Sequence, residues 1–330
     1  MKLFERLLGP NISKLESHGN IEALTNIVES DNHLDLRIAA IEALSRIGGP
    51  QATGPLITAL SDDDSEVAQA AEKAVAGFGS AAGAALIGAL GDQGGDAAMK
   101  ILLSLGDEAI ELLRDACGAQ DEGVRRRALD GLVELDTRLH NDEVRENLFR
   151  ALLGTLGDRS AECRVFAATK LESLGDARAS RALAAQLKDG EDTVRTACRQ
   201  ALKAIAEPAV PYLLDALTDR NPNSRRLAAE LLGEVCRGEV RIESRRVALS
   251  ALADRASDSN AEIAAAVRRA LETIPKDGVI AARLELLADP ERSDHEDIQE
   301  FLNQMLTHGA LTPESKARIT ERMSSLVFAD

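Results

Sequence analysis

The chain has 330 residues, of which 45% are hydrophobic and only 2% aromatic, and its formal net charge is −16. Leu, Ala, Ile and Val must therefore fill the interior, which argues against a β-sandwich built from β-branched and aromatic side chains. Nucleic-acid binding depends on phosphate neutralisation by Lys and Arg, so the excess of acid disfavours that class, although a local basic patch stays open.

The segment from Met1 to Leu8 carries charges within its apolar stretch and lacks the core of a signal peptide. No apolar run of the sequence approaches the length that crosses a bilayer, so we expect no membrane insertion. The four cysteines lie far apart, whereas disulfide and zinc frameworks use tighter spacings. We therefore expect a reducing, cytoplasmic location with buried thiols.

Following an expected helix at Ile21–Val28, one helical pattern recurs along the chain. Apolar or small residues occupy positions 0, +3, +4, +7 and +8, which form one face of a helix. The segments begin at Leu36, Val67, Gly94, Val124, Cys163, Val194, Ser224 and Ile263. They are 27 to 39 residues apart, and a second helix is expected after each. Because one helical hairpin cannot bury its own apolar face, the pattern predicts stacked hairpins.

The predicted fold is therefore an all-α solenoid of about eight or nine helical hairpins with capping helices at both ends. We expect a single domain over residues 1–330, with an N-terminal cap at 1–30, repeats at 31–290 and a C-terminal cap at 291–330. Thr312 followed by Pro313 predicts the start of the last capping helix.

An aspartate followed six residues later by an arginine also recurs at the repeat period. The Asp ends the loop that enters a helix and the Arg lies in its first turn, so the pair can satisfy loop amides and tie adjacent repeats together. A row of catalytic carboxylates is the alternative. The pairs of this structural ladder are Asp31 with Arg37, Asp158 with Arg164, Asp189 with Arg195, and Asp219 with Arg225.

Two further repeats keep the acid without the arginine. Asp62 and Asp258 are followed at the same spacing by Ala68 and Ala264. We therefore expect these two aspartates to have lost their partner.

This pattern of Asp, five residues, Arg and an Ala-rich helix resembles the HEAT-repeat superfamily, and especially the short repeats also found in phycobilisome bilin lyases. The resemblance extends from about Asn11 to Asp289 and implies an architecture more than an activity. Some HEAT proteins bind a di-iron centre through several His-Glu pairs. This sequence has one such pair, His295-Glu296, so we expect neither that centre nor another cofactor or metal.

Three stretches break the repeat. The long spacings place extra residues between the helices of two hairpins, around 136–143 and 237–241, where insertions commonly mark a binding edge and tolerated loop growth is the alternative. Seven glycines between Gly77 and Gly95 predict the loosest part of the stack. The candidate partner-binding residues at the insertions are Arg138, His140 and Arg241.

No catalytic constellation is evident, because the histidines are scattered and the cysteines lack an adjacent base. We therefore expect a non-enzymatic scaffold or adaptor that binds a protein or peptide on a concave face lined by the arginine-bearing helices. A bilin lyase subunit or pigment chaperone, suggested by the resemblance, is the alternative. Nucleic-acid binding by basic clusters ranks third, since stacking aromatics are nearly absent. The candidate residues on the concave face are Glu42, Lys73, Asp130, Gln200, Glu230 and Arg269.

Overall fold

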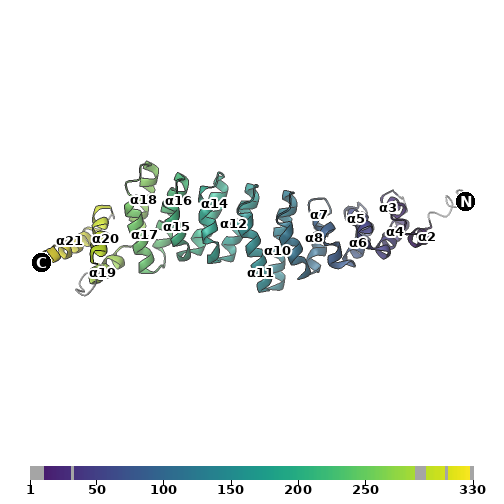
Figure 1. Cartoon of the computed structure of the whole chain (residues 1–330), viewed down its shortest axis with the longest axis horizontal. Coiled ribbons are helices and arrows are strands. Elements are labelled where there is room, and N and C mark those ends of the chain that lie inside the picture. Colours follow the sequence, from purple (N-terminus) through teal and green to yellow (C-terminus); the bar gives the residue numbers. More distant parts are fainter. Residues whose placement is uncertain (1–10, 31–32, 287–294, 309–310, 328–330) are drawn as a thin grey trace. The chain divides into compact units, whose positions relative to one another are not determined.

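The computed structural model describes residues 11–30, 33–286, 295–308 and 311–327. Within these ranges the regular structure consists of twenty α-helices, α2 to α21, and five short 3-10 turns, without a strand (Figure 1). The prediction of an all-α fold of stacked hairpins is confirmed. The chain divides into two compact units, unit 1 (residues 1–155) and unit 2 (residues 156–330). The expected single domain with caps at 1–30 and 291–330 stays a prediction.

Unit 1 holds the first four hairpins. Its repeat-pattern helices α4, α6, α8 and α10 pack against one another in order, and the partner helices α5, α7, α9 and α11 form a second row. Residues Ile21–Val28, expected to be helical, belong to α3. The helices are α2 (Ile12–Ser17), α3 (Ile21–Ser30), α4 (Leu34–Ile47), α5 (Gly49–Thr58), α6 (Ser65–Ala76), α7 (Gly83–Ala89), α8 (Gly95–Ser104), α9 (Glu108–Ala116), α10 (Glu122–Leu139) and α11 (Asp142–Thr155).

Unit 2 repeats the arrangement, with α12, α14, α16 and α18 in one row and α13, α15, α17 and α19 in the other. Helix α20 packs on α17 and α19, and α21 packs on α19 and α20. Its helices are α12 (Ala161–Leu174), α13 (Ser180–Ala185), α14 (Asp192–Ile205), α15 (Val210–Ala216), α16 (Pro222–Arg237), α17 (Ile242–Asp254), α18 (Ala261–Thr273), α19 (Asp277–Leu286), α20 (His295–His308) and α21 (Pro313–Val327).

The core follows the predicted stripe. In α14 the side chains of Val194, Cys198, Ala201 and Leu202, at positions 0, +4, +7 and +8, are all completely buried. Burial of a large aliphatic side chain contributes about 1.5 to 3 kcal/mol, so each repeat is stabilised mainly by contact with its neighbours. The small residues of the stripe set how closely the helices approach.

The first stretch of extra residues differs from the expected loop, whereas most of the second forms the loop that was expected. Residues 136–139 continue α10, which reaches Leu139, because Leu135 prolongs the buried stripe and Arg138 Nε bonds Glu134 Oε1 at 2.8 Å. The connection to α11 keeps only two residues. In the second stretch Arg237 is the last residue of α16, and residues 238–241 form the connection. Thus much of the extra sequence lengthens helices, since it keeps helical periodicity.

Close packing accounts for several glycines between Gly77 and Gly95. A Cβ atom on Gly83 would lie 2.7 Å from a methyl carbon of Leu112, and one on Gly94 would lie 2.7 Å from Ser61 Oγ. At these positions neighbouring side chains occupy the space of a Cβ atom and would have to shift to admit one. The expectation that this stretch is the loosest part of the stack stays a prediction.

Candidate partner-binding surface

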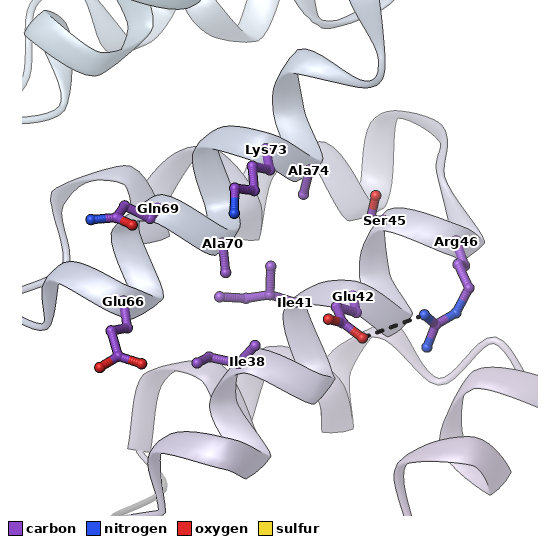
Figure 2. Close-up of a pocket in the computed structure, with 10 residues that line it drawn as sticks. All are labelled: Ile38, Ile41, Glu42, Ser45, Arg46, Glu66, Gln69, Ala70, Lys73 and Ala74. Atoms are coloured by element: carbon purple, nitrogen blue, oxygen red, sulfur yellow. Dashed lines mark ion pairs between the residues drawn. The ribbon is translucent and has the colours of Figure 1, made fainter.

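A groove runs between helices α4 and α6 of unit 1, and about 450 Å³ of it admits water-sized molecules. Figure 2 shows Ile38, Ile41 and Ala70 in its middle, with charged and polar side chains around them. Ile41 is completely buried, so its side chain belongs to the floor. The lining of this α4/α6 groove consists of Ile38, Ile41, Glu42, Ser45, Arg46, Glu66, Gln69, Ala70, Lys73 and Ala74.

The charged residues at the rim of the α4/α6 groove differ in the ion pairs that they form. Arg46 is held from α2, because its Nε and Nη2 lie 2.7 and 3.0 Å from the carboxylate oxygens of Glu16. These hydrogen bonds lower the pKa of the Glu16 carboxyl. Glu42 is 3.7 Å from Arg46 Nη1. Lys73 makes no ion pair with any residue that the structure describes, so its ammonium group is open to a ligand.

A second groove lies between α16 and α18 of unit 2, with about 290 Å³ open to water-sized molecules. It occupies the same repeat positions as the first: Glu230 and Arg269 stand where the α4/α6 groove has Glu42 and Lys73, and both grooves carry alanines on the downstream helix. The lining of this α16/α18 groove consists of Arg199, Glu230, Gly233, Glu234, Arg237, Ala266, Arg269, Ala270 and Thr273.

Ion pairs tie the two glutamates of the α16/α18 groove to α14. Arg199 bonds Glu234 and lies 3.5 Å from Glu230 through Nη1, while Lys203 Nζ lies 3.2 Å from Glu234. Burial by itself raises the pKa of Glu234, but the hydrogen bonds and charges of Arg199 and Lys203 outweigh it and lower that pKa. The Glu234 carboxyl is therefore held ionised at neutral pH.

The structure thus brings together four of the six residues predicted for the concave face, Glu42 with Lys73 and Glu230 with Arg269. Asp130 on α10 and Gln200 on α14 are exposed but line neither groove. Asp130 is engaged on its own helix, where its Oδ2 lies 3.4 Å from Arg126 Nε.

The candidates at the extra residues lie apart from both grooves. Arg138 is occupied by Glu134, and His140 ends α10 in the left-handed region with φ 48°. Arg241 Nε donates to Glu207 Oε1 at 2.6 Å, and Ser244 Oγ donates to the same oxygen. These bonds lower the pKa of Glu207, so Arg241 fastens the start of α17 to the preceding hairpin.

Sequence reasoning did not select Arg199 or Arg237 as lining residues. Arg237 lies thirteen positions after the start of its repeat segment, beyond the pattern that was compared. It reaches the groove because α16 continues for sixteen residues, whereas α14 has fourteen. The long spacing between the segments that begin at Ser224 and Ile263 was the signal for a longer helix. The extra residues were assigned from the sequence to the connection between helices.

The predicted ladder connects successive repeats through the arginine. Arg164 donates from Nε and Nη2 to the Asp189 carboxylate at 2.8 and 2.9 Å, and from Nη1 to the carbonyl oxygen of Asp158 at 2.8 Å. The carboxylate of Asp158 instead accepts from Ser160 N at 2.7 Å. The Arg therefore bonds the backbone of its own loop and the carboxylate of the following loop.

The same forward pairing corrects the expectation for two aspartates. Asp62 pairs with Arg37, and Asp258 accepts from Arg225 Nε at 3.2 Å, so neither has lost its partner. The expectation was wrong because it assumed a partner within the same repeat, at Ala68 and Ala264. Arg225 also donates to the carbonyl oxygen of its own loop residue Asp219 at 3.0 Å.

Other members of the ladder differ. Arg195 donates from Nη1 to the carbonyl oxygens of Asp189 and Gly190 at 2.6 and 2.9 Å, but its Nη2 bonds Asp192 on its own helix. Arg37 Nε donates to Val28 O at 2.6 Å. Asp31 lies outside the described residues.

In the third repeat, which lacks the ladder arginine, an arginine of the next repeat replaces it. Gly95 occupies the arginine position of the third repeat, and Arg127 of the next repeat donates from Nη1 to Leu90 O at 2.7 Å and to Asp92 O at 3.3 Å. A Cβ atom on Gly95 would lie 1.4 Å from that same Nη1. Because Gly95 has no side chain, the Arg127 guanidinium can occupy the space next to it.

The thiols are placed for packing. Burial raises the pKa of Cys198 to about 12 and that of Cys236 to about 11, which keeps both protonated at neutral pH and makes them poor nucleophiles. In the described ranges no group of three His, Cys, Asp or Glu side chains is placed to hold a metal ion. Nor does any helix in those ranges have the length and apolar character that spans a membrane.

Two rows of helices, built from hairpins that recur with the same loop contacts, define a helical-repeat protein of the solenoid class. The chain matches the family model of HEAT repeats over residues 21–106 and 149–233. It belongs to the HEAT-repeat family, as the resemblance implied. The narrower likeness to the repeats of bilin lyases is not shown.

Solved structures similar to this chain include three of low identity. An engineered protein is 18% identical, with 95% of this chain and 85% of that chain covered and a TM-score of 0.32. Human deoxyhypusine hydroxylase in complex with glycerol is 22% identical, with 79% and 98% covered and a TM-score of 0.31. A chain from the structure of Kap95p with RanGDP is 14% identical, with 96% and 56% covered and a TM-score of 0.43. No curated protein matches the sequence.

Proposed function

We propose that this chain is a non-enzymatic scaffold or adaptor that binds protein or peptide segments on the exposed face of its repeat-pattern helices. The observation that supports it most is the recurrence of a groove with the same chemistry, an acid on the upstream helix, a cation on the downstream helix and alanines between them. Glu42 and Lys73 provide these charges in unit 1, and Glu230 and Arg269 in unit 2. Each groove takes its own segment of a partner.

The α4/α6 groove suits a side chain that is apolar and a backbone that is extended or helical. A ligand methyl group placed on Ile38 and Ala70 leaves water, which contributes about 25 cal/mol for each Å² buried. The polar rim fixes the orientation of the segment, as in peptide grooves that combine an apolar floor with a few polar groups. This division of roles needs no catalytic group.

Mild crosslinking of the tagged protein in its native extract, followed by mass spectrometry, tests the proposal. Wild type is expected to retain one stoichiometric protein partner. Lys73→Glu in the α4/α6 groove and Arg269→Glu in the α16/α18 groove are expected to weaken its retention, because each replaces a cation with an acid in a groove that already has two glutamates. Both residues reach the surface, and far-UV circular dichroism checks that the variants stay folded.

Arg181→Glu is the matched control, since it makes the same charge change at an exposed position on α13, in the other row of helices. It is expected to retain the partner. Retention by both groove variants, or the absence of any enriched protein, would overturn the proposal. In the second case a shifted absorption spectrum on adding bilin would favour the pigment-binding alternative.

A further inference from the structure

The α16/α18 groove has a surplus of positive charge in a chain whose formal net charge is −16. Each glutamate of this groove is already shared between two cations. Glu230 lies 3.0 Å from Arg226 Nη1 and 3.5 Å from Arg199 Nη1, and Glu234 pairs with Arg199 and Lys203. These acids have little capacity left for a further cation.

Arg237 and Arg269 supply the surplus. Arg269 Nε makes one long bond of 3.4 Å to Ala265 O of its own helix, and no described acid lies within ion-pair distance of either guanidinium. Glu272, one turn further along α18, forms no ion pair with either arginine. Together with Arg199, Lys203 and Arg226, the two arginines oppose two carboxylates with five cationic side chains.

The floor of the groove leaves these arginines accessible. A Cβ atom on Gly233 would lie 2.9 Å from Ala270 Cα and 3.1 Å from Thr273 Oγ1, so α16 and α18 touch there through backbone and small side chains. Arg237 and Arg269 are both exposed and both line this groove, so a ligand can approach both from it.

We propose that the α16/α18 groove binds an acidic peptide segment whose Asp or Glu carboxylates are held by Arg237 and Arg269. Guanidinium groups bind carboxylates through two parallel N–H donors, a geometry that lysine cannot offer. The proposal rests on the proposed function and names the chemistry of the partner in unit 2. The lining contains no aromatic side chain for base stacking, which favours a peptide over a single-stranded nucleic acid.

The α4/α6 groove provides the internal comparison. Its rim has two acids, Glu42 and Glu66, and two cations, Arg46 and Lys73, so it carries no surplus. Its lining also includes two isoleucines, whereas the lining of the α16/α18 groove has no large aliphatic side chain. The acidic preference therefore belongs to unit 2 alone.

Fluorescence anisotropy with a labelled peptide of alternating Glu and Ala tests this preference on the full chain. Wild type is expected to bind it about tenfold more tightly at low salt than the same peptide with Gln in place of Glu, since two exposed ion pairs are lost with the Gln peptide. The preference falls as salt is added. Equal affinity for the Glu and Gln peptides would overturn the proposal.

The double variant Arg237→Gln with Arg269→Gln is expected to lose about fivefold or more of its affinity for the Glu peptide. The matched control removes two exposed arginines of unit 2 outside the groove, Arg181→Gln with Arg220→Gln, and is expected to bind like wild type. A groove variant that binds like the control would contradict the assignment, and far-UV circular dichroism of both variants excludes a loss of folding.

A labelled oligothymidylate separates the competing class of ligand. Tighter binding of the oligonucleotide than of the Glu peptide, lost in Arg237→Gln with Arg269→Gln, would overturn the peptide proposal in favour of nucleic acid. Failure of the Glu peptide, with a protein partner still captured and released by Lys73→Glu, would sink this inference while leaving the scaffold proposal intact.

Discussion

The loops that enter the repeat-pattern helices are stabilised by different arginine hydrogen bonds in the two units. In unit 2 the arginines of α12, α14 and α16 each bond the carbonyl groups of their own loop. In unit 1 the second and third repeats have Ala68 and Gly95 at that position, and Arg127 reaches back from α10 to the loop before Gly95. Within α10, Arg125 bonds the carbonyl oxygens of its own loop at 2.9 and 3.0 Å.

This difference teaches that the donor for the loop carbonyls can come from the repeat itself or from the next one, so its sequence position can change. Buried or half-buried carbonyl groups without a donor lose the free energy of a hydrogen bond. An arginine is long enough to supply it from its own repeat or from the next. Variants at the two kinds of donor are therefore expected to affect the stability of different units.

The largest effect is expected for Arg164→Gln, which should lower the free energy of unfolding of unit 2 by about 3 kcal/mol. The change leaves the Asp189 carboxylate, 7% exposed, without its cation and removes a donor from Asp158 O. Fluorescence of Tyr212 during urea unfolding measures it, because Tyr212 is the single tyrosine of a chain without tryptophan and lies on α15.

Arg178→Gln is the control, since Arg178 is 58% exposed and pairs with Asp176 at the surface. Its effect is expected to stay below about 0.5 kcal/mol. A similar loss in both variants would mean that the ladder arginine contributes no more than a surface ion pair.

Gly95→Ala is expected to cost about 2 kcal/mol in unit 1, because the new methyl group displaces the Arg127 guanidinium and also approaches Leu90 O at 2.8 Å. Gly88→Ala, where nothing lies within 4 Å of the added carbon, is expected to be neutral or stabilising by up to about 1 kcal/mol. Urea unfolding followed by far-UV circular dichroism compares them. Strict additivity of Gly95→Ala with Arg127→Gln would contradict the proposed contact.

Lowering the pH should reduce the difference in the free energy of unfolding between wild type and Arg164→Gln. Burial raises the pKa of the Asp189 carboxyl, but hydrogen bonds from Arg164 and Glu191 N, with the nearby arginine charges, outweigh it and lower that pKa. A carboxyl with a lowered folded pKa stabilises the fold above its unfolded pKa of about 3.9, and this contribution disappears as pH falls through the folded pKa. Unfolding measured from neutral pH downwards is thus expected to show a deficit that is constant near pH 7 and shrinks below about pH 4. A constant deficit at all pH values would exclude the Asp189 pair as its source.

The smallest effect is expected for Ala206→Gly, a stabilisation of unit 2 by about 0.5 to 1 kcal/mol. Ala206 ends α14 with φ 63° and ψ −125°, a conformation in which a Cβ atom is unfavourable. Gly175, with φ 61°, already fills the corresponding place after α12. Thermal unfolding followed by Tyr212 fluorescence measures the change, and a lower midpoint would show that the side chain of Ala206 contributes contacts of its own.

The architecture could be predicted because stacked hairpins repeat their apolar stripe, and the stripe in α14 is buried as its period indicates. Partner choice within the ladder could not be predicted. The spacing from Asp158 to Arg164 is constant in sequence, but which carboxylate the guanidinium reaches depends on the offset between neighbouring helices. That offset is a property of packing, and a single repeat does not contain it.

For the candidate site, the sequence pattern selected Glu42, Lys73, Glu230 and Arg269 for the expected concave face, each six residues into its segment, and the structure places them in two grooves. The pattern did not identify which interhelical gaps are open. Gly233 permits the contact with Ala270, and α16 extends far enough to bring Arg237 to the same groove. Both facts depend on the length of α16 and on how closely it approaches α18. A pattern common to all the repeats does not describe either property.

The forward pairing of the ladder gives the chain a direction. Arg164 contributes to the repeat that follows it, through Asp189, and Arg225 does so through Asp258. A copy of one hairpin inserted between two others would therefore join correctly only if it brought an aspartate for the arginine before it and an arginine for the aspartate after it. The span from one such arginine to its aspartate, Arg164 to Asp189, covers the hairpin of α12 and α13 and ends in the loop that enters α14, so a unit added to or removed from this protein has to include that loop.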